Sequence, residues 1–251
     1  MKPRTIRYLH RLAALLVGWQ LLIWLTTGLY FNLTPHEELK GSTYLATQSQ
    51  AKVPKLSQFT LLEPATILER HSSTETLSLI WLNQRPYYLL SHRTTRYAHQ
   101  CQQQSLVDAS TGLPYQLNAE DAASLANASY SGPGQVVATN HIPQNQSEWP
   151  KQCNALWQVQ FNDTLHTRVY LDARSGQLIG HKNRHTEVAD LMWRLHFMDL
   201  FNQGSFNQPL AWLMALLSLG LVYSGGGLII QDWRKKRRYN KSLIKAASPT
   251  D

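Results

Sequence analysis

Three histidines stand where an imidazole could either ligate a haem iron or hold a helix at a membrane surface. His196 follows Met192 by about one turn and joins the apolar side of an amphipathic helix predicted over residues 187–201. Asp199, three residues later, would orient the ring through its second nitrogen, as is usual for a ligating histidine. One interpretation is an axial haem ligand. The alternative is an interfacial histidine that bonds a backbone carbonyl.

The faces of that predicted helix follow from its spacing. An acidic residue and an arginine four positions later, Asp190 and Arg194, would form an ion pair on the polar face together with Glu187. The apolar face would hold residues at helical spacing, namely Val188, Leu191, Met192, Leu195 and Met198.

The other two candidates border the first apolar stretch. His10 lies at its start beside Arg7 and Arg11, where the alternative is contact with lipid headgroups, and His36 lies just past its far end, where the alternative is a loop residue. A helix rises ~1.5 Å per residue, so His10 and His36 would be about 39 Å apart and cannot share one haem within a chain. His36 and His196 could share one. A haem at the other end would need His10 from two chains, hence a homodimer.

Two long uncharged stretches must position these residues. Residues 13–33 and 209–230 each approach the ~20 residues that a bilayer-crossing helix needs. Basic residues border both stretches, and such residues stay on the cytoplasmic side. We therefore expect cytoplasmic termini and an outside segment over residues 34–206. The bordering basic residues are Arg4, Arg7, Arg11, Arg234, Lys235, Lys236, Arg237 and Arg238.

The composition must be read with these spans in mind. The mean hydropathy is −0.33 and the net charge +8. Much of the basic charge lies beside the apolar stretches, where it sets topology and attracts lipid headgroups, so we do not expect nucleic-acid binding. The first apolar run outlasts the ~7–15 residues of a signal peptide, and no A-x-A-like site follows it. It is expected to remain as an anchor.

The two cysteines, Cys101 and Cys153, both fall in the expected outside segment. Disulfides persist in that environment, and neither cysteine belongs to a C-x-x-C pair. We expect a structural disulfide between them, with two buried free thiols as the alternative.

The middle of the chain contains an internal repeat. The heptapeptide LVDASTG around Asp108 matches YLDARSG around Asp172, 64 positions later. Each predicts a strand that ends in a tight turn, opened by Asp and closed by Gly at positive φ. Short helices are predicted before each set of strands, over residues 63–70 and 118–126. Each repeat is therefore expected to be one helix followed by antiparallel strands.

These units resemble the PepSY domain. The tripeptide LHR at residues 9–11, MWRLHFMD at residues 192–199 and FNQPL at residues 206–210 resemble PepSY-associated transmembrane proteins. The resemblance implies a bacterial inner-membrane protein with a periplasmic PepSY region. Larger relatives include four-helix membrane reductases, linked to iron–siderophore uptake, that carry haem between histidines; other PepSY domains are thought to bind or restrain peptidases. This chain has two spans and no G-x-G-x-x-G motif, which argues against a complete reductase.

The expected fold is α+β, with two transmembrane helices flanking two PepSY-like units. The expected function is an accessory role in membrane electron transfer, with haem b as cofactor and His196, His10 and His36 as its ligands. The partners would be the bilayer and a second copy or another membrane subunit. The alternatives are a non-enzymatic module that holds a periplasmic peptide, peptidase or partner subunit, and structural support in a transport complex. No catalytic residue or separate metal site is expected.

The expected boundaries are residues 1–33 for the first span, 34–57 for a linker, 58–117 and 118–185 for the units, 186–208 for the interfacial helix and loop, 209–231 for the second span and 232–251 for a basic tail.

Overall fold

The computed structural model describes residues 3–47, 54–93, 96–97, 99–144, 148–204 and 208–247. The chain divides into two compact units, each described here by itself. The first, called the helical unit, comprises Met1–Tyr30, Trp193–Leu200 and Ser205–Asp251. The second, called the head, comprises Phe31–Met192 and Phe201–Gly204.

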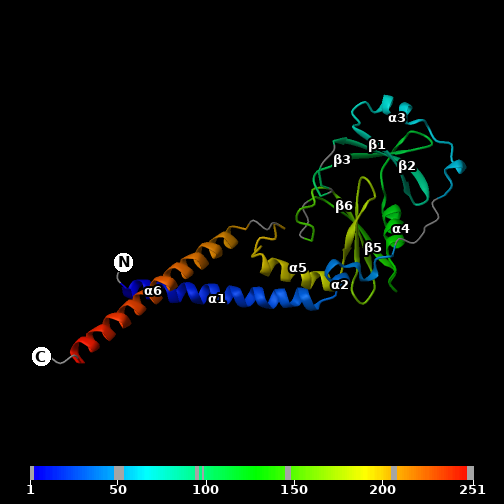
Figure 1. The fold of residues 1–251 in the computed structure, drawn as a ribbon. Helices are drawn as coiled ribbons and strands as arrows, with labels where there is room; N and C mark the ends of the chain where they lie inside the picture. Colours follow the sequence, from blue (N-terminus) through cyan, green and yellow to red (C-terminus); the bar gives the residue numbers. More distant parts are fainter. Residues whose placement is uncertain are drawn as a thin grey trace. The chain divides into compact units, whose positions relative to one another are not determined.

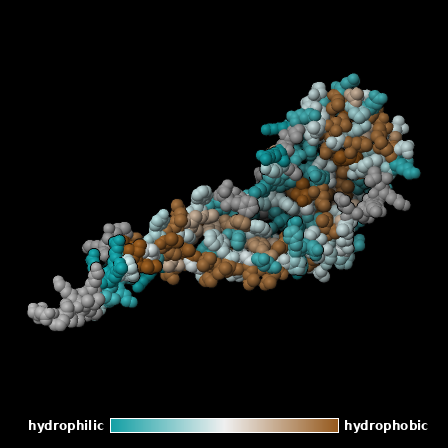
Figure 2. All heavy atoms as spheres, viewed as in Figure 1, coloured by the Kyte–Doolittle hydropathy of each residue, from teal (hydrophilic) through white to brown (hydrophobic). Residues whose placement is uncertain are grey.

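Two long helices make up most of the helical unit, α1 (Pro3–Leu33) and α6 (Pro209–Ala247) (Figure 1, blue and orange to red). Each contains a segment long and apolar enough to cross a membrane, Arg4–Leu33 and Pro209–Asn240. At ~1.5 Å per residue these segments measure about 45 and 48 Å, more than the ~30 Å hydrocarbon core. Large apolar side chains are exposed along both helices (Figure 2, brown). The helices predicted at the two ends are confirmed, and α6 continues through most of the expected tail.

The first half of the head is a helix followed by a four-stranded antiparallel sheet in the order β1-β2-β3-β4. Its helix begins with a proline at the first position, as predicted. Ile67 of this helix packs on the sheet residues Tyr88, Leu90 and Val107 and forms one core. The elements are α3 (Pro64–Arg70), β1 (Thr76–Leu82), β2 (Arg85–Arg93), β3 (Gln103–Asp108) and β4 (Pro114–Tyr115).

The second half repeats this order, with a helix followed by the antiparallel sheet β5-β6-β7-β8 (Figure 1). Its helix begins in a capping box: Asn118 accepts from the Asp121 backbone N–H, and the Asp121 carboxylate accepts from the Asn118 N–H. Ala122 and Ala126 are fully buried against the sheet. The elements are α4 (Ala119–Ser129), β5 (Val136–Ile142), β6 (Leu156–Phe161), β7 (Arg168–Asp172) and β8 (Leu178–Lys182).

The repeated turns are alike bond for bond. Asp108 Oδ1 accepts from the N–H groups of Ser110 and Thr111 at 2.9 and 2.8 Å, and Asp172 Oδ1 accepts from those of Arg174 and Ser175 at 2.9 Å each. Gly112 and Gly176 close the turns at φ 73° and 70°. Both glycine N–H groups donate to the carbonyl of their aspartate, at 2.8 and 2.9 Å. The predicted internal repeat is thereby confirmed.

A third core joins the two halves of the head. It contains Leu82, Tyr87, Leu106 and Leu117 from the first half, and residues of the second half, including Trp157, pack against it. A disulfide also links the halves, between Cys101 before β3 and Cys153 before β6, as predicted.

The segment expected to be a linker, residues 34–57, is structured over most of its described part. It contains α2 (His36–Lys40), η1 (Ser42–Tyr44) and η2 (Leu56–Gln58). Tyr44 packs edge-on against Tyr130 of the second core, with ring centroids 5.8 Å apart. Residues 48–53 of the expected linker, and Phe206 and Asn207 of the FNQPL motif, lie outside the described residues.

Candidate functional site

One stripe of α1 is turned away from the surface of the helical unit. Its members recur mostly every three or four residues, whereas the leucines and tryptophans between them are exposed. The stripe includes three polar residues, His10, Gln20 and Thr27, on a face where lipid would not leave them unsatisfied. The stripe consists of Ile6, His10, Ala13, Val17, Gln20 and Thr27.

The first candidate site, called the His10 site, joins α1 to α6. Nδ1 of His10 lies 2.8 Å from the hydroxyl oxygen of Ser224. The neighbouring Gly225 leaves room for the ring, because a Cβ atom there would lie 3.2 Å from His10 Cε1. One turn before His10, Arg7 contacts Asp232 at 3.3 Å. The start of α1 therefore lies beside the basic stretch of α6 within the helical unit.

The second candidate site, called the His196 site, joins α1 to the end of α5 (Arg184–His196). Nδ1 of His196 lies 2.8 Å from the hydroxyl oxygen of Thr27, which is 2% exposed. The indole N–H of Trp24 donates to the backbone carbonyl of His196 over 2.7 Å. Helix α1 thus holds both the side chain and the main chain of this histidine.

The end of α5 explains the MWRLHFMD motif. Met198 adopts a left-handed conformation at φ 54°, and the Asp199 N–H donates to the Arg194 carbonyl over 2.8 Å. This is the pattern of a Schellman cap, in which a left-handed residue ends the helix and the next N–H reaches back five residues. The cap fixes His196 in the last turn.

Helix α5 differs from its prediction at both ends. It begins at Arg184, where Asn183 caps it by accepting from the Thr186 N–H at 3.1 Å, and it ends before Met198 rather than at residue 201. The expected ion pair between Asp190 and Arg194 is wrong: Asp190 pairs with Lys182 at 2.5 Å. The partner of Asp190 therefore lies on strand β8 and not one turn further along the helix.

The predicted ligands do not all meet. His10 and Thr27 are 17 residues apart on α1, so the His10 and His196 sites are separated by about 26 Å of helix rise. His36 opens α2 in the head and is exposed. Nδ1 of His196 contacts Thr27, 169 positions earlier, and the expected contact of the other ring nitrogen with Asp199 stays a prediction.

Gln20 lies in the same stripe between the two sites and is 8% exposed. Its amide nitrogen has no hydrogen-bond acceptor in the described part of the chain. A buried unsatisfied donor costs about 1–3 kcal/mol.

The residues of the two sites fit a haem held by imidazoles. Each site fixes one histidine by its Nδ1, the usual arrangement for a ligating ring, and the His10 site uses a glycine where a side chain would press on the imidazole. Each site contains one histidine, and the described residues contain no group of three His, Cys, Asp or Glu side chains that could hold a metal ion. A six-coordinate haem would need a second histidine at each site.

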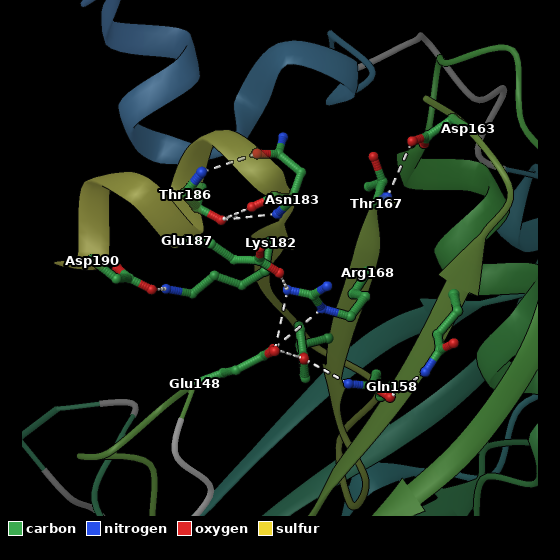
Figure 3. A network of polar contacts seen from close by, with 12 residues as sticks. Glu148, Gln158, Asp163, Thr167, Arg168, Lys182, Asn183, Thr186, Glu187 and Asp190 are labelled. Atoms are coloured by element: carbon green, nitrogen blue, oxygen red, sulfur yellow. Dashed lines mark hydrogen bonds and ion pairs between the residues drawn. The ribbon is translucent and has the colours of Figure 1, made fainter. Parts of the chain in front are cut away.

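The head carries a separate polar network at the edge of its second sheet (Figure 3). Arg168 contacts Glu148 at 3.1 Å and Glu187 at 2.8 Å. Beside it lies a recess of about 500 Å³ bordered by β6, β7 and the start of α5. The recess is lined by Val137, Gln160, Phe161, Asn162, His166, Thr167, Arg168, Arg184 and Glu187.

Several residues of the two histidine sites were not predicted from the sequence. Thr27, Trp24, Gln20 and Ser224 were not identified as partners of the histidines. Their signal is positional, since His10, Gln20 and Thr27 keep to one stripe of a helix whose other positions are mostly apolar.

Comparison with known proteins covers nearly the whole chain. A family described as the PepSY-associated TM region matches residues 7–248. The matched range includes both candidate sites and the head. No curated protein and no solved structure matches the chain.

Proposed function

This chain belongs to the PepSY-associated transmembrane family, and we propose that it is a haem-binding accessory of electron transfer in the bacterial inner membrane. The observation that carries the proposal is the pair of membrane-helix histidines, His10 and His196, each held through Nδ1 by a hydroxyl from a neighbouring segment. Haem held between two imidazoles transfers one electron at a time.

The topology follows from the charges. Arg7 and Asp232 are in contact, so the basic residues at the start of α1 and those around Arg234 lie at one end of the helix pair. Basic residues at span ends remain in the cytoplasm, which supports a cytoplasmic side for the His10 site and a periplasmic side for the His196 site. The head is periplasmic in this arrangement, where its disulfide would persist.

Protease treatment of intact spheroplasts tests this topology. Protease added from outside should cleave the head and spare an epitope placed after the basic stretch of α6. Cleavage of that epitope with an intact head would contradict the arrangement.

A second copy of the chain completes each site. Two copies related by a twofold axis along the membrane normal would bring two His10 side chains together at one depth and two His196 side chains at the other. The dimer would also surround the porphyrins with four helices, which two spans cannot do. Exposed apolar surface on both helices is available for this contact (Figure 2). The alternative second ligand on the periplasmic side is His36.

An absorbance spectrum of detergent-purified protein from haem-replete cells tests the proposal. We expect a Soret band with sharp α and β bands after dithionite. His10→Ala and His196→Ala should each remove about half of the signal, because each variant empties one of two sites. His166→Ala, at an exposed position of the head, is the control. A colourless wild-type preparation would contradict haem binding, and a monomeric haem-bound species in native mass spectrometry would contradict the dimer.

The recess of the head favours one other function, a periplasmic module that holds a peptide or partner subunit. Arg168 and Arg184 line it and suit a carboxylate group. Arg184→Ala should weaken capture of an acidic periplasmic peptide without changing the haem spectrum. Retention of the spectrum and loss of electron transfer in that variant would indicate that the head docks the redox partner.

A further inference from the structure

We infer that Thr27 and Ser224 are positioning residues that fix which ring nitrogen carries the proton in His196 and His10. The inference concerns the protonation pattern of the two rings, and it rests on the proposed function only in taking haem iron as their ligand. Each hydroxyl has one proton and two close partners, and the chemistry of those partners decides where the proton lies.

At the His196 site, the Thr27 hydroxyl oxygen lies 2.7 Å from the Ile23 carbonyl oxygen and 2.8 Å from His196 Nδ1. A carbonyl oxygen only accepts, so the one hydroxyl proton must be donated to Ile23. The remaining contact is favourable only if Nδ1 carries a proton and donates it to Thr27. A neutral ring then has its lone pair on Nε2.

The His10 site repeats this arrangement with a different hydroxyl on a different helix. The Ser224 oxygen lies 2.7 Å from the Gly220 carbonyl oxygen and 2.8 Å from His10 Nδ1. The serine proton is therefore donated to its own helix, and His10 must donate from Nδ1. Both rings adopt the same tautomer for the same reason.

This tautomer prepares each ring to ligate iron through Nε2. An acceptor on Nδ1–H fixes the ring's orientation and raises the basicity of the other nitrogen. Without the hydroxyl, Nδ1 loses the acceptor that favours this tautomer. Thr27 and Ser224 thus act through the histidines and do not touch the iron.

The chain supplies a matched control for each position. Thr26, next to Thr27, bonds the Leu22 carbonyl over 2.8 Å and is exposed. Ser218, six residues before Ser224, bonds the Met214 carbonyl over 2.8 Å. Each control makes the same bond to its own helix and, among the described residues, bonds neither histidine. Its removal therefore separates the effect on the ring from the effect on the helix.

Nitrogen NMR of the haem-free full chain tests the protonation pattern directly. The protein would be made in haem-deficient cells with ¹⁵N-labelled histidine, placed in lipid nanodiscs at a pH where imidazole is neutral, and assigned with His10→Gln and His196→Gln. We expect Nδ1 of both residues in the protonated range and Nε2 in the unprotonated range. Thr27→Val should mix the tautomers of His196 alone, and Ser224→Ala those of His10 alone. A proton on Nε2 in the wild type would overturn the inference, as would equal effects of Thr26→Val and Thr27→Val.

Haem titration of the same variants tests the consequence. Loss of the hydrogen bond to a ligating ring lowers metal affinity by about 10–100-fold, so Thr27→Val should weaken haem binding at the His196 site by about that factor. The midpoint potential should rise, since a less basic ligand favours the ferrous state. Thr27→Ser keeps a hydroxyl and should retain the wild-type haem affinity and midpoint potential. Ser218→Ala and Thr26→Val should change neither quantity. Equal affinity in Thr27→Val and Thr26→Val would overturn the inference, whereas a wild type that binds no haem would overturn the proposed function and leave the NMR result to decide the tautomer.

Discussion

Trp24 donates its indole N–H to the backbone carbonyl of His196 over 2.7 Å. Thr27, less than one turn further along α1, contacts the imidazole of the same residue. His196 therefore has both its main chain and its ring held by one helix, although 172 positions separate it from Trp24. This double attachment ties the end of α5 to the first span and fixes the depth of the candidate ligand.

Trp24→Phe should loosen that attachment. The substitution keeps most of the apolar surface and removes one hydrogen bond, for a local cost of about 1 kcal/mol. Hydrogen exchange should speed up by about fivefold at the amides around residues 193–200. The matched control is Trp19→Phe, since Trp19 lies on the same helix and is 70% exposed. Unchanged exchange in Trp24→Phe, or an equal change in the control, would show that the bond does not hold α5.

The two repeated turns should differ in importance despite their identical bonds. Asp172 and Ser175 are buried, whereas the equivalent Asp108 is half-buried and Thr111 is exposed. Asp172→Ala should therefore destabilise the head by about 1–3 kcal/mol, because it leaves buried N–H groups without an acceptor, and Asp108→Ala should cost less because water reaches its turn. Urea unfolding of the full chain, followed at the head, checks the order. Equal losses would mean that burial of the second turn adds nothing.

The fold was largely predictable from the sequence because its signals are local. Asn118 and Pro64 mark helix starts by backbone chemistry that involves only neighbouring residues. The repeated Asp and Gly residues specify their turns in the same way, and two apolar stretches of span length have few alternative structures. The end of α5 was less accessible, because Met198 stops the helix at a left-handed angle that its residue type does not favour.

The head should lose stability as the pH falls from about 6.5 towards 4. Burial lowers the pKa of His181 to about 4 from an ordinary value of 6.5. In this window His181 binds a proton in the unfolded chain but not in the folded head. The free energy of unfolding therefore decreases as the pH decreases, by up to about 3 kcal/mol over the whole window. Urea unfolding at pH 7.5 and 5 measures the difference. His181→Leu should flatten the dependence, whereas His166→Gln, at an exposed position, should leave it unchanged. A wild type whose stability does not fall over this range would contradict the prediction.

Tyr130→Phe should be more damaging than Tyr88→Phe. The Tyr130 hydroxyl donates to Asp163 over 2.7 Å and accepts from the Gly134 N–H over 3.0 Å. Burial, followed by the bond to Asp163, raises the pKa of Tyr130 to about 12, so the hydroxyl keeps its proton at neutral pH. Removal of the Tyr130 hydroxyl takes one hydrogen-bond partner from the Asp163 carboxylate and one from the Gly134 N–H, at a cost of about 1–3 kcal/mol. The Tyr88 hydroxyl makes one bond among the described residues, to the Leu62 carbonyl. Thermal unfolding of the two variants gives the comparison, and equal Tm values would contradict it.

The candidate site was predicted only in part, because its contacts join distant segments. The sequence singled out His10 by its position at a span end and His196 by its place on an amphipathic helix. Spacing could not pair them with Ser224 and Thr27, 214 and 169 positions away. Sequence spacing considers only neighbours, so it could suggest Asp199 as a partner of His196 but could not suggest Thr27. The available signal was the row of polar residues on one face of an apolar span. It indicates which face of the helix is buried, but it does not predict which residues contact that face.

The most direct test of the account is the ratio of haem to protein in the purified full chain, measured with the His10→Ala, His196→Ala and double variants. A dimer with one haem between each pair of equivalent histidines predicts about one haem per chain, about half of that in each single variant and none in the double variant. Haem at the wild-type ratio in the double variant, or its absence from the wild type, would contradict the claim that these two histidines hold the cofactor.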